Sequence, residues 1–198
     1  MNIHAVIDTN VIVSAILTRN QESPTRGILE KVRNGHITPM VNAAIMEEYL
    51  DVLSRSKFRL KMEVIQEVKS LFEVRGAHYD PEISESCLID PDDQIFYETY
   101  QMVEDAYLIT GNLRHYPVEP RILSPSDMMS ILELAESSSG NILSEPSCEY
   151  LSDEKQARLQ RAWDTIERSR MEALANGTAD MSMEEIDEEI RLYREARY

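Results

Sequence analysis

The chain has 198 residues, 42% of them hydrophobic, so it can bury an ordinary core and still carry an extension. Its formal net charge of -16 argues against a protein that holds nucleic acid by overall charge, so any nucleic acid must be gripped locally or through metal ions. Cys87 and Cys148 lie far apart without a His or Cys at ligand spacing, which favours a reducing cytoplasm, and we expect neither secretion nor membrane insertion.

The chain opens with a predicted buried strand over residues 3–7, which is followed by Asp8. Apolar and β-branched residues dominate this run, and the chain becomes acidic where the strand ends. Because ligands of open α/β sheets bind at the carboxyl ends of the strands, Asp8 is the first candidate for chemistry. An Asp-Thr-Asn break then separates the strand from the apolar run 11–17, which favours a helix there over a continued strand.

Alternating helices and strands are predicted between residues 24 and 79. Pro24 begins a helix that Asn34-Gly35 ends, and Asn42 caps the next helix. Within this capped helix Glu48 borders the apolar face, since the residues one turn away on both sides are apolar. The predicted elements are helices 24–34, 43–54 and 62–74 and strands 36–41 and 77–79.

A dense basic segment, residues 55–61, interrupts this acidic chain. Its simplest interpretation is a solvated loop between two helices. A functional interpretation is a phosphate-binding edge for a single strand of nucleic acid, with Arg55 and Lys57 as substrate contacts and Phe58 available for stacking.

A second acidic concentration, Asp90-Pro91-Asp92-Asp93, opens a predicted helix that runs to about Glu104. Acidic residues in a first turn complement the helix dipole and need no function, but three aspartates in four residues exceed what a cap requires. Brought together with Asp8 and Glu48, these like charges would destabilise the fold unless a hard cation such as Mg²⁺ or Mn²⁺ neutralised them. A cation of this kind activates water and therefore suits phosphodiester cleavage.

Strands at 106–109 and 122–123 and a helix capped by Ser126 complete the alternation. The pattern predicts an α/β fold over residues 1–136, a three-layer α/β/α sandwich around a mostly parallel sheet. Thr110 and Asn112 follow one of these strands, at the same edge of the sheet as Asp8. No glycine-rich phosphate loop occurs, so a nucleotide cofactor is not expected.

The composition of the sequence changes after residue 136. Residues 137–150 are a predicted polar linker, and residues 151–198 are a predicted helical extension of two amphipathic helices. Ser152 caps the first helix, which ends near Asn176-Gly177, and a capping box over Ser182–Glu185 starts the second. Because two such helices bury little by themselves, they must lie on the preceding domain or on a second copy of it.

Several short motifs, in matching order and spacing over roughly the first 136 residues, resemble those of PIN-domain ribonucleases. They are VIDTNV at 6–11, EEYLDVLSRSKF at 47–58, DPDD at 90–93, LITGNLRHY at 108–116 and ILSP at 122–125. The closest group is the toxin components of bacterial toxin-antitoxin pairs. The resemblance implies a PIN-like fold, a homodimer in the cytoplasm, and cleavage of single-stranded RNA with Mg²⁺ or Mn²⁺.

Carried over residue by residue, the resemblance places the catalytic, metal-binding acids of the family at Asp8, Glu48 and Asp93. Asp90 is an accessory candidate for the metal. Asp92 is a less favoured alternative to its neighbour Asp93.

Asn112 is also a candidate catalytic residue, but it stands where many PIN nucleases carry an aspartate. Its carbonyl oxygen can still ligate a metal or orient a metal-bound water, although without a charge it would hold a second metal weakly. Thr110 could assist substrate binding through its hydroxyl, and an ordinary strand-end hydroxyl is an equal interpretation. His115, on the loop that follows, could act toward substrate, but a loop histidine is more often structural, and we leave it out of the predicted site.

The C-terminal helices resemble the toxin-wrapping part of a bacterial antitoxin without its DNA-binding domain. The segments are RLQRAWDTIERSR at 158–170 and MSMEEIDEEIRLYREAR at 181–197. Such tails often occlude the PIN active site, sometimes with an arginine among the acids, which makes Arg191, Arg194 and Arg197 candidates for an inhibitory contact. A guanidinium can pair bidentately with a carboxylate and displace a metal. The plainer interpretation is that each arginine balances the charge of glutamates on a solvent-exposed face of the helix.

The leading hypothesis is a metal-dependent endoribonuclease inhibited by its own antitoxin-like segment, acting in cis or from a second copy. The rival is a non-catalytic PIN-like module that works through RNA binding or oligomerisation. A phosphoacceptor receiver-like domain would share Asp8 and Thr110, but it requires a lysine where Ser124-Pro125 stands, so it ranks below both.

Overall fold

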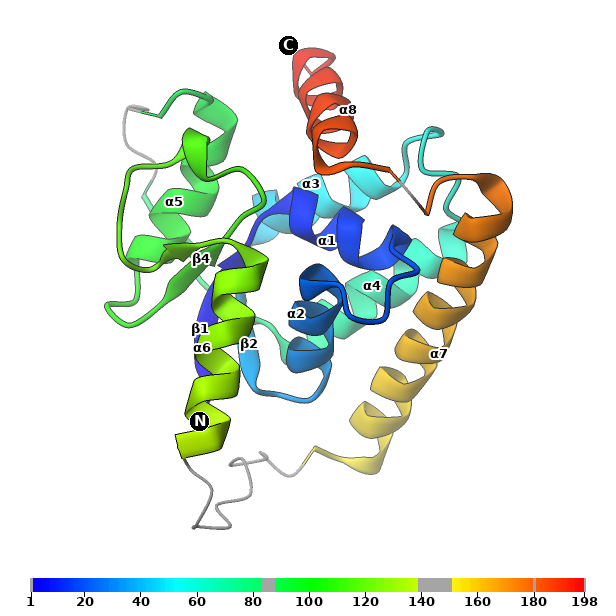
Figure 1. Cartoon of the computed structure of the whole chain (residues 1–198), viewed down its shortest axis with the longest axis horizontal. Coiled ribbons are helices and arrows are strands. Elements are labelled where there is room, and N and C mark those ends of the chain that lie inside the picture. The colour runs from blue at the N-terminus through cyan, green and yellow to red at the C-terminus, as the bar shows by residue number, and fades with distance from the viewer. Residues whose placement is uncertain (1, 83–87, 139–150, 180, 198) are drawn as a thin grey trace.

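The computed structural model describes residues 2–82, 88–138, 151–179 and 181–197, and its centre is a parallel β-sheet (Figure 1). In this described part the sheet has five strands in the order β3-β2-β1-β4-β5, and every neighbouring pair is parallel. Ile3 of the central strand β1 is in register with Ile37, and Ile7 with Ile109. The strands are β1 (Ile3–Ile7), β2 (Ile37–Val41), β3 (Ala77–His78), β4 (Tyr107–Ile109) and β5 (Ile122–Leu123).

Helices pack on the sheet and confirm the predicted α/β architecture. In Figure 1, α6 lies in front of the strands, and α3 and α4 lie behind them. The run after Asp8 is helical from Thr9 onward, so the alternative of a continued strand is wrong. The helices of this part are α1 (Thr9–Leu17), α2 (Pro24–Arg33), α3 (Ala43–Leu53), α4 (Met62–Arg75), α5 (Gln94–Gln101) and α6 (Pro125–Ser138).

Several predicted boundaries differ from the observed ones. The prediction that Ser126 caps a helix is wrong, because α6 begins at Pro125 and the Ser124 hydroxyl accepts the Asp127 N–H at 3.2 Å. The helix expected to start at the aspartate cluster is divided into a 3₁₀ turn, η1 (Pro91–Asp93), and α5, which ends at Gln101. The side chain of Asp90 accepts the backbone N–H of Asp92 at 3.0 Å and so begins the 3₁₀ turn as its cap. At its C-terminal end α6 extends to Ser138, so the first two residues of the expected linker are helical. The rest of that linker, 139–150, lies outside the described residues.

The two predicted C-terminal helices are present as α7 (Asp153–Asn176) and α8 (Met183–Glu195). Ser182 and Glu185 form the expected capping box of α8, and Gly177 ends α7 in the left-handed conformation with φ 73°. α7 packs mainly on α4 and also touches α1, while α8 rests on α1 and α3. No helix in the described ranges is long and apolar enough to cross a membrane.

Arg170 anchors α7 to the body of the protein. Its Nε and Nη2 donate to the Ala15 carbonyl at 3.0 and 2.7 Å, in the last turn of α1, where carbonyls have no partner within the helix. A cation at this end also complements the helix dipole. Burial lowers the pKa of Arg170 to about 10, so the side chain stays charged at neutral pH. Trp163 of α7 packs beside it, with the guanidinium carbon 5.1 Å from the ring centroid.

Candidate active site

Three buried carboxylates meet at the carboxyl edge of the sheet. Asp8 follows β1 directly, Glu48 lies on the buried face of α3, and Asp93 stands where η1 passes into α5. Their residues are only 4%, 5% and 2% exposed. Since carboxylates are rarely buried so fully without partners, the arrangement is costly unless hydrogen bonds or cations compensate it.

Asp8 keeps a buried carboxylate with few compensating contacts. The Thr110 hydroxyl donates to Asp8 Oδ2 at 2.6 Å, and the Tyr116 hydroxyl stands 3.5 Å from the same oxygen. Burial raises the pKa of Asp8 to about 7, and the charge of Asp93 raises it as well. Thr110, which directly follows β4, opposes both effects, because the hydrogen bond from its hydroxyl lowers the pKa of Asp8.

Glu48 is oriented by the helix that starts after Asp8. The Thr9 hydroxyl donates to Glu48 Oε1 at 2.7 Å. Burial raises the pKa of Glu48, while Arg194 and this hydrogen bond lower it. Glu48 lies close enough to Asp8 for its charge to raise the pKa of Asp8, so the fold brings together two residues from separate parts of the predicted site.

Asp93 is linked to Asn112 through His115. His115 Nδ1 lies 2.8 Å from Asp93 Oδ2, and His115 Nε2 lies 2.8 Å from Asn112 Nδ2. A carboxylate only accepts hydrogen bonds, so Nδ1 carries the proton, and the neutral ring accepts the Asn112 amide at Nε2. This chain fixes the Asn112 amide with its carbonyl oxygen free for another partner. The hydrogen bond to Asp93 is the main reason why the pKa of His115 is raised.

His115, which is not among the predicted site residues, contacts two of them, Asp93 and Asn112. One atom each of Asp90, Asp93 and His115 lie within 4.8 Å of one another, a spacing that a metal ion could bridge. The sequence offers one local indication that His115 belongs to the site, its short distance along the chain from Asn112. His115 stands three residues after Asn112 on a single 3₁₀ turn, η2 (Leu113–His115).

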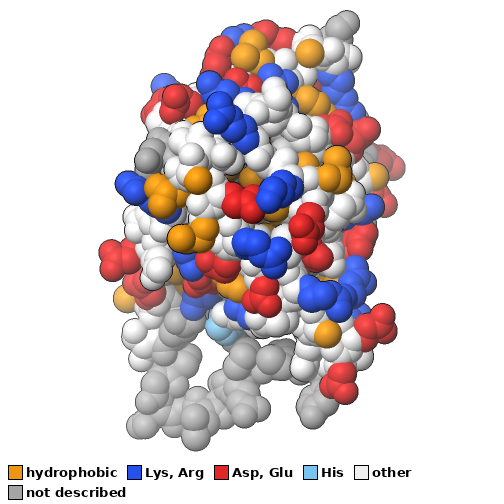
Figure 2. Space-filling model, turned by 90° about the vertical axis from the view of Figure 1, so that its right-hand side faces the viewer, with side chains coloured by type: hydrophobic (Ala, Val, Ile, Leu, Met, Phe, Trp, Pro, Cys, Tyr) orange, Lys and Arg blue, Asp and Glu red, His pale blue; other side chains and the backbone are white. Residues whose placement is uncertain are grey.

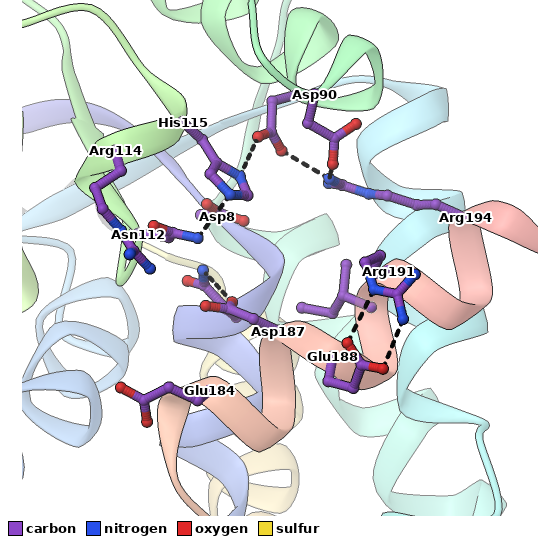
Figure 3. A pocket seen from close by; sticks show the side chains of 13 residues that line it. Asp8, Asp90, Asn112, Arg114, His115, Glu184, Asp187, Glu188, Arg191 and Arg194 are labelled. Carbon is purple, nitrogen blue, oxygen red and sulfur yellow. Dashed lines mark hydrogen bonds and ion pairs between the residues drawn. The ribbon is translucent and has the colours of Figure 1, made fainter.

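Arg194 of α8 reaches into this acidic cluster (Figure 3). Its Nη1 contacts Asp90 Oδ2 at 2.7 Å and Asp93 Oδ1 at 2.8 Å, and its Nη2 contacts Glu48 Oε1 at 2.9 Å. The side chain is 8% exposed. Burial lowers the pKa of Arg194, but the charges of Glu48 and Asp93 outweigh burial and raise it overall, so the guanidinium is a fixed cation.

The other two candidate arginines lie outside the cluster. Arg191 pairs with Glu188 at 2.6 Å and with Glu195, both on its own helix, and about half of its side chain is exposed. Arg197 contacts Glu47 Oε2 at 2.7 Å on the exposed side of α3. Arg191 thus balances glutamates on an exposed face, and of the three candidates only Arg194 lies among the buried carboxylates.

The rest of α8 closes over the site and leaves a small cavity. The Asn10 amide donates to Asp187 Oδ1 at 2.9 Å, and Asn10 Oδ1 accepts the Gly111 N–H at 3.1 Å. A side chain at Gly111 would meet the Met183 sulfur at 2.7 Å, so the glycine permits the helix to approach. The remaining cavity has a volume of about 250 Å³ and is lined by Asp8, Asp93, Asn112, Arg114, Asp187 and Arg194 among others.

The basic loop, residues 55–61, follows α3 and contacts the C-terminal helices. Arg55 pairs with Glu189 of α8 at 2.9 Å. Lys57 is exposed, and the structure joins its ammonium to no other described residue. Phe58 is 1% exposed and belongs to the hydrophobic core, so the prediction that it is available for stacking is wrong. Its apolar ring gains more from burial than from solvent exposure on a charged loop.

Comparison with known proteins gives one match. A family model described as PIN domain matches residues 4–114, more than half of the chain. That range contains Asp8, Glu48, Asp90, Asp93 and Asn112, and it excludes the C-terminal helices. No curated protein and no solved structure matches the chain.

Proposed function

Because the chain belongs to the PIN domain family, we propose that it is a metal-dependent endoribonuclease acting on single-stranded RNA, inhibited by its own C-terminal helices. The observation that carries the proposal is the position of Arg194, which contacts Glu48, Asp90 and Asp93 at 2.7 to 2.9 Å. The guanidinium of Arg194 on α8 lies where a cation is needed to compensate the charge of the buried carboxylates.

The donor set fits Mg²⁺ or Mn²⁺. Asp8, Glu48 and Asp93 offer carboxylate oxygens, with Asp90 as an accessory, and Asn112 offers a carbonyl oxygen, all of which hard divalent cations prefer. When bound, such an ion supplies activation of a water molecule and charge stabilisation on the departing oxygen.

The chain's own residues hold these donors in place. Thr110 and Thr9 direct one oxygen each of Asp8 and Glu48 through hydrogen bonds of 2.6 and 2.7 Å. His115 orients Asp93 and presents the Asn112 carbonyl. Fixing ligand orientation in this way favours binding, because less conformational freedom is lost when the ion enters.

Arg194 and a divalent cation would compete for the same oxygens. A guanidinium paired with three carboxylates compensates their charge, and removing one member of such a buried network costs several kcal/mol. We propose that α8 thereby excludes metal and substrate together, in an arrangement in which a toxin-like nuclease and an antitoxin-like segment share one cytoplasmic chain. The segment acts in cis or from a second copy in a homodimer.

Comparing two arginine variants of α8 tests this proposal. Arg194→Ala should cleave a single-stranded RNA pool in Mn²⁺ much faster than the unchanged chain, whereas Arg191→Ala, one turn away on the exposed face, should behave like the unchanged chain. Adding Asp8→Asn to Arg194→Ala should abolish the cleavage. Cleavage that survives Asp8→Asn contradicts the site assignment.

The rival function, a non-catalytic RNA-binding or interaction module, is favoured by two observations. Asn112 brings no charge to the site, and α8 covers it. If Arg194→Ala is folded by circular dichroism and binds RNA, yet cleaves none with Mg²⁺ or Mn²⁺, the rival replaces the nuclease.

A further inference from the structure

The basic loop carries cations at every second position, Arg55, Lys57, Arg59 and Lys61, in a chain with a net charge of -16. It joins α3, which bears Glu48, to α4, and Arg55 contacts Glu189 of α8, the helix that carries Arg194 into the candidate active site. A polyanion approaching this site would be repelled by most of the molecule, and a local group of cations beside the site would offset that repulsion.

Three of these four cations contact the C-terminal helices. Arg55 Nε lies 2.9 Å from Glu189 Oε2, and Lys61 Nζ lies 2.6 Å from Glu172 Oε1. Arg59 Nη1 donates to the Asn176 carbonyl at 2.9 Å, in the last turn of α7, where the helix dipole places partial negative charge. Each cation thus faces an anionic or partly anionic oxygen from the tail.

The loop keeps its shape through contacts with the body of the protein. Phe58 is anchored in the hydrophobic core, and the N–H groups of Phe58 and Arg59 donate to the carbonyls of Arg55 and Ser56. Arg59 has a φ of 53°, a left-handed conformation that costs a non-glycine residue about 1 to 2 kcal/mol. The chain accepts this strain at a residue whose side chain donates to the Asn176 carbonyl, and strain of this kind gathers at binding sites.

We propose that Arg55, Arg59 and Lys61 bind consecutive phosphates of the single-stranded RNA, and that Glu189, Glu172 and the α7 carboxyl end occupy those phosphate positions in the closed protein. The inference rests on the proposed function and adds the path of the substrate. The C-terminal helices thus compete with RNA at the basic loop as well as with metal at the carboxylates. On the face drawn in Figure 2, where α7 lies, Lys and Arg side chains stand next to Asp and Glu side chains.

The three cations suit phosphate because phosphate, like the C-terminal helices, presents anionic oxygens to them. An anionic oxygen at 2.6 to 2.9 Å from a guanidinium or ammonium is the geometry of charge-assisted binding, whether the oxygen belongs to a carboxylate or to a nucleic acid. Arg55 uses Nε for Glu189, and both of its Nη groups could engage a phosphate once the tail leaves.

The two halves of one ion pair provide a sharp test, because Arg55→Gln and Glu189→Gln break the same contact with the tail. Each is placed in the full chain with Arg194→Ala, and the affinity for a fluorescent single-stranded RNA is measured by anisotropy in EDTA, so that no cleavage is needed. If Arg55 serves the tail alone, both changes raise RNA affinity equally. If it binds phosphate, Glu189→Gln raises affinity and Arg55→Gln lowers it relative to Glu189→Gln.

The double change isolates the RNA contact. Glu189→Gln with Arg55→Gln should bind about five-fold more weakly than Glu189→Gln alone at 0.1 M salt, and its salt slope should fall by about 0.7, the value for one phosphate contact to a single strand. Equal affinity and slope for these two proteins would overturn the proposal, as would the absence of RNA binding in every variant. If Arg194→Ala cleaves RNA but these two proteins have the same RNA affinity and salt slope, the proposed nuclease function stands and the proposed RNA path along the basic loop is refuted.

Discussion

Replacing Asp8 by Asn tests whether burial of its carboxylate costs stability in the metal-free protein. The carboxyl has a pKa of about 7 in the folded chain, against about 4 for an exposed aspartate. Between these two values the folded protein holds a proton that the unfolded chain has lost. The free energy of unfolding therefore falls as the pH rises from 4 to 7, and the penalty is complete above pH 7.

The size of this effect follows from the difference between the two pKa values. About three pH units at about 1.4 kcal/mol each give a penalty of about 4 kcal/mol at pH 8. At pH 5 only about a third of that penalty has developed, because the folded carboxyl is still protonated. Since Asn cannot ionise, the Asp8→Asn protein should gain roughly 2 to 3 kcal/mol on the unchanged chain between pH 5 and pH 8.

Urea unfolding at pH 5 and pH 8, in EDTA, measures this difference. Asp105→Asn is the matched control, because the side chain of Asp105 is 91% exposed, and its substitution should change stability by less than about 0.5 kcal/mol at either pH. An Asp8→Asn protein whose advantage does not grow with pH would refute the reasoning, and would mean that the ionised carboxylate is well compensated without a metal.

Three further substitutions have defined outcomes. In the Arg194→Ala background, His115→Ala should weaken Mn²⁺ binding roughly 10- to 100-fold by calorimetry, because Asp93 and Asn112 lose their common orienting partner; unchanged binding would contradict this role. Phe58→Ala should cost about 3 to 5 kcal/mol in urea unfolding, and a small loss would mean that the ring is not a core residue. Gly177→Ala should cost about 1 to 2 kcal/mol through backbone strain alone, since φ is 73° and no atom lies within 4 Å of the added carbon; an unchanged midpoint would show that α7 ends differently.

Local signals predicted much of the fold. The apolar strand before Asp8 and the caps at Asn42, Ser152 and Ser182 all appear where the sequence places them, because hydrophobic periodicity and capping act over a few residues. The helix expected from Asp90 is divided, since the Asp90 cap closes a tight 3₁₀ turn that a run of acidic residues does not distinguish from an α-helical first turn.

The candidate site shows where local reasoning stops. Arg191 and Arg194 are three residues apart on α8, which places them about 60° from each other around the helix, and Arg197 follows just beyond its end. Which one faces the acids depends on how α8 sits on α1 and α3, and the helix sequence alone does not determine that. His115 is not predicted as a site residue for a similar reason, because its partner Asp93 is 22 residues away and is brought near only by the sheet topology.

The short connection between the two C-terminal helices has a thermodynamic consequence. α7 ends at Asn176 and α8 begins at Met183, and a flexible connection of this length has a root-mean-square end-to-end distance of roughly 13 Å. While α7 remains docked, α8 rebinds at an effective concentration in the millimolar range, whatever the protein concentration. Dilution would therefore not free the site, and the same helix supplied as a separate peptide would be a weak competitor. Displacing α8 from the site would require ligands that outcompete a helix held nearby by its connection to α7.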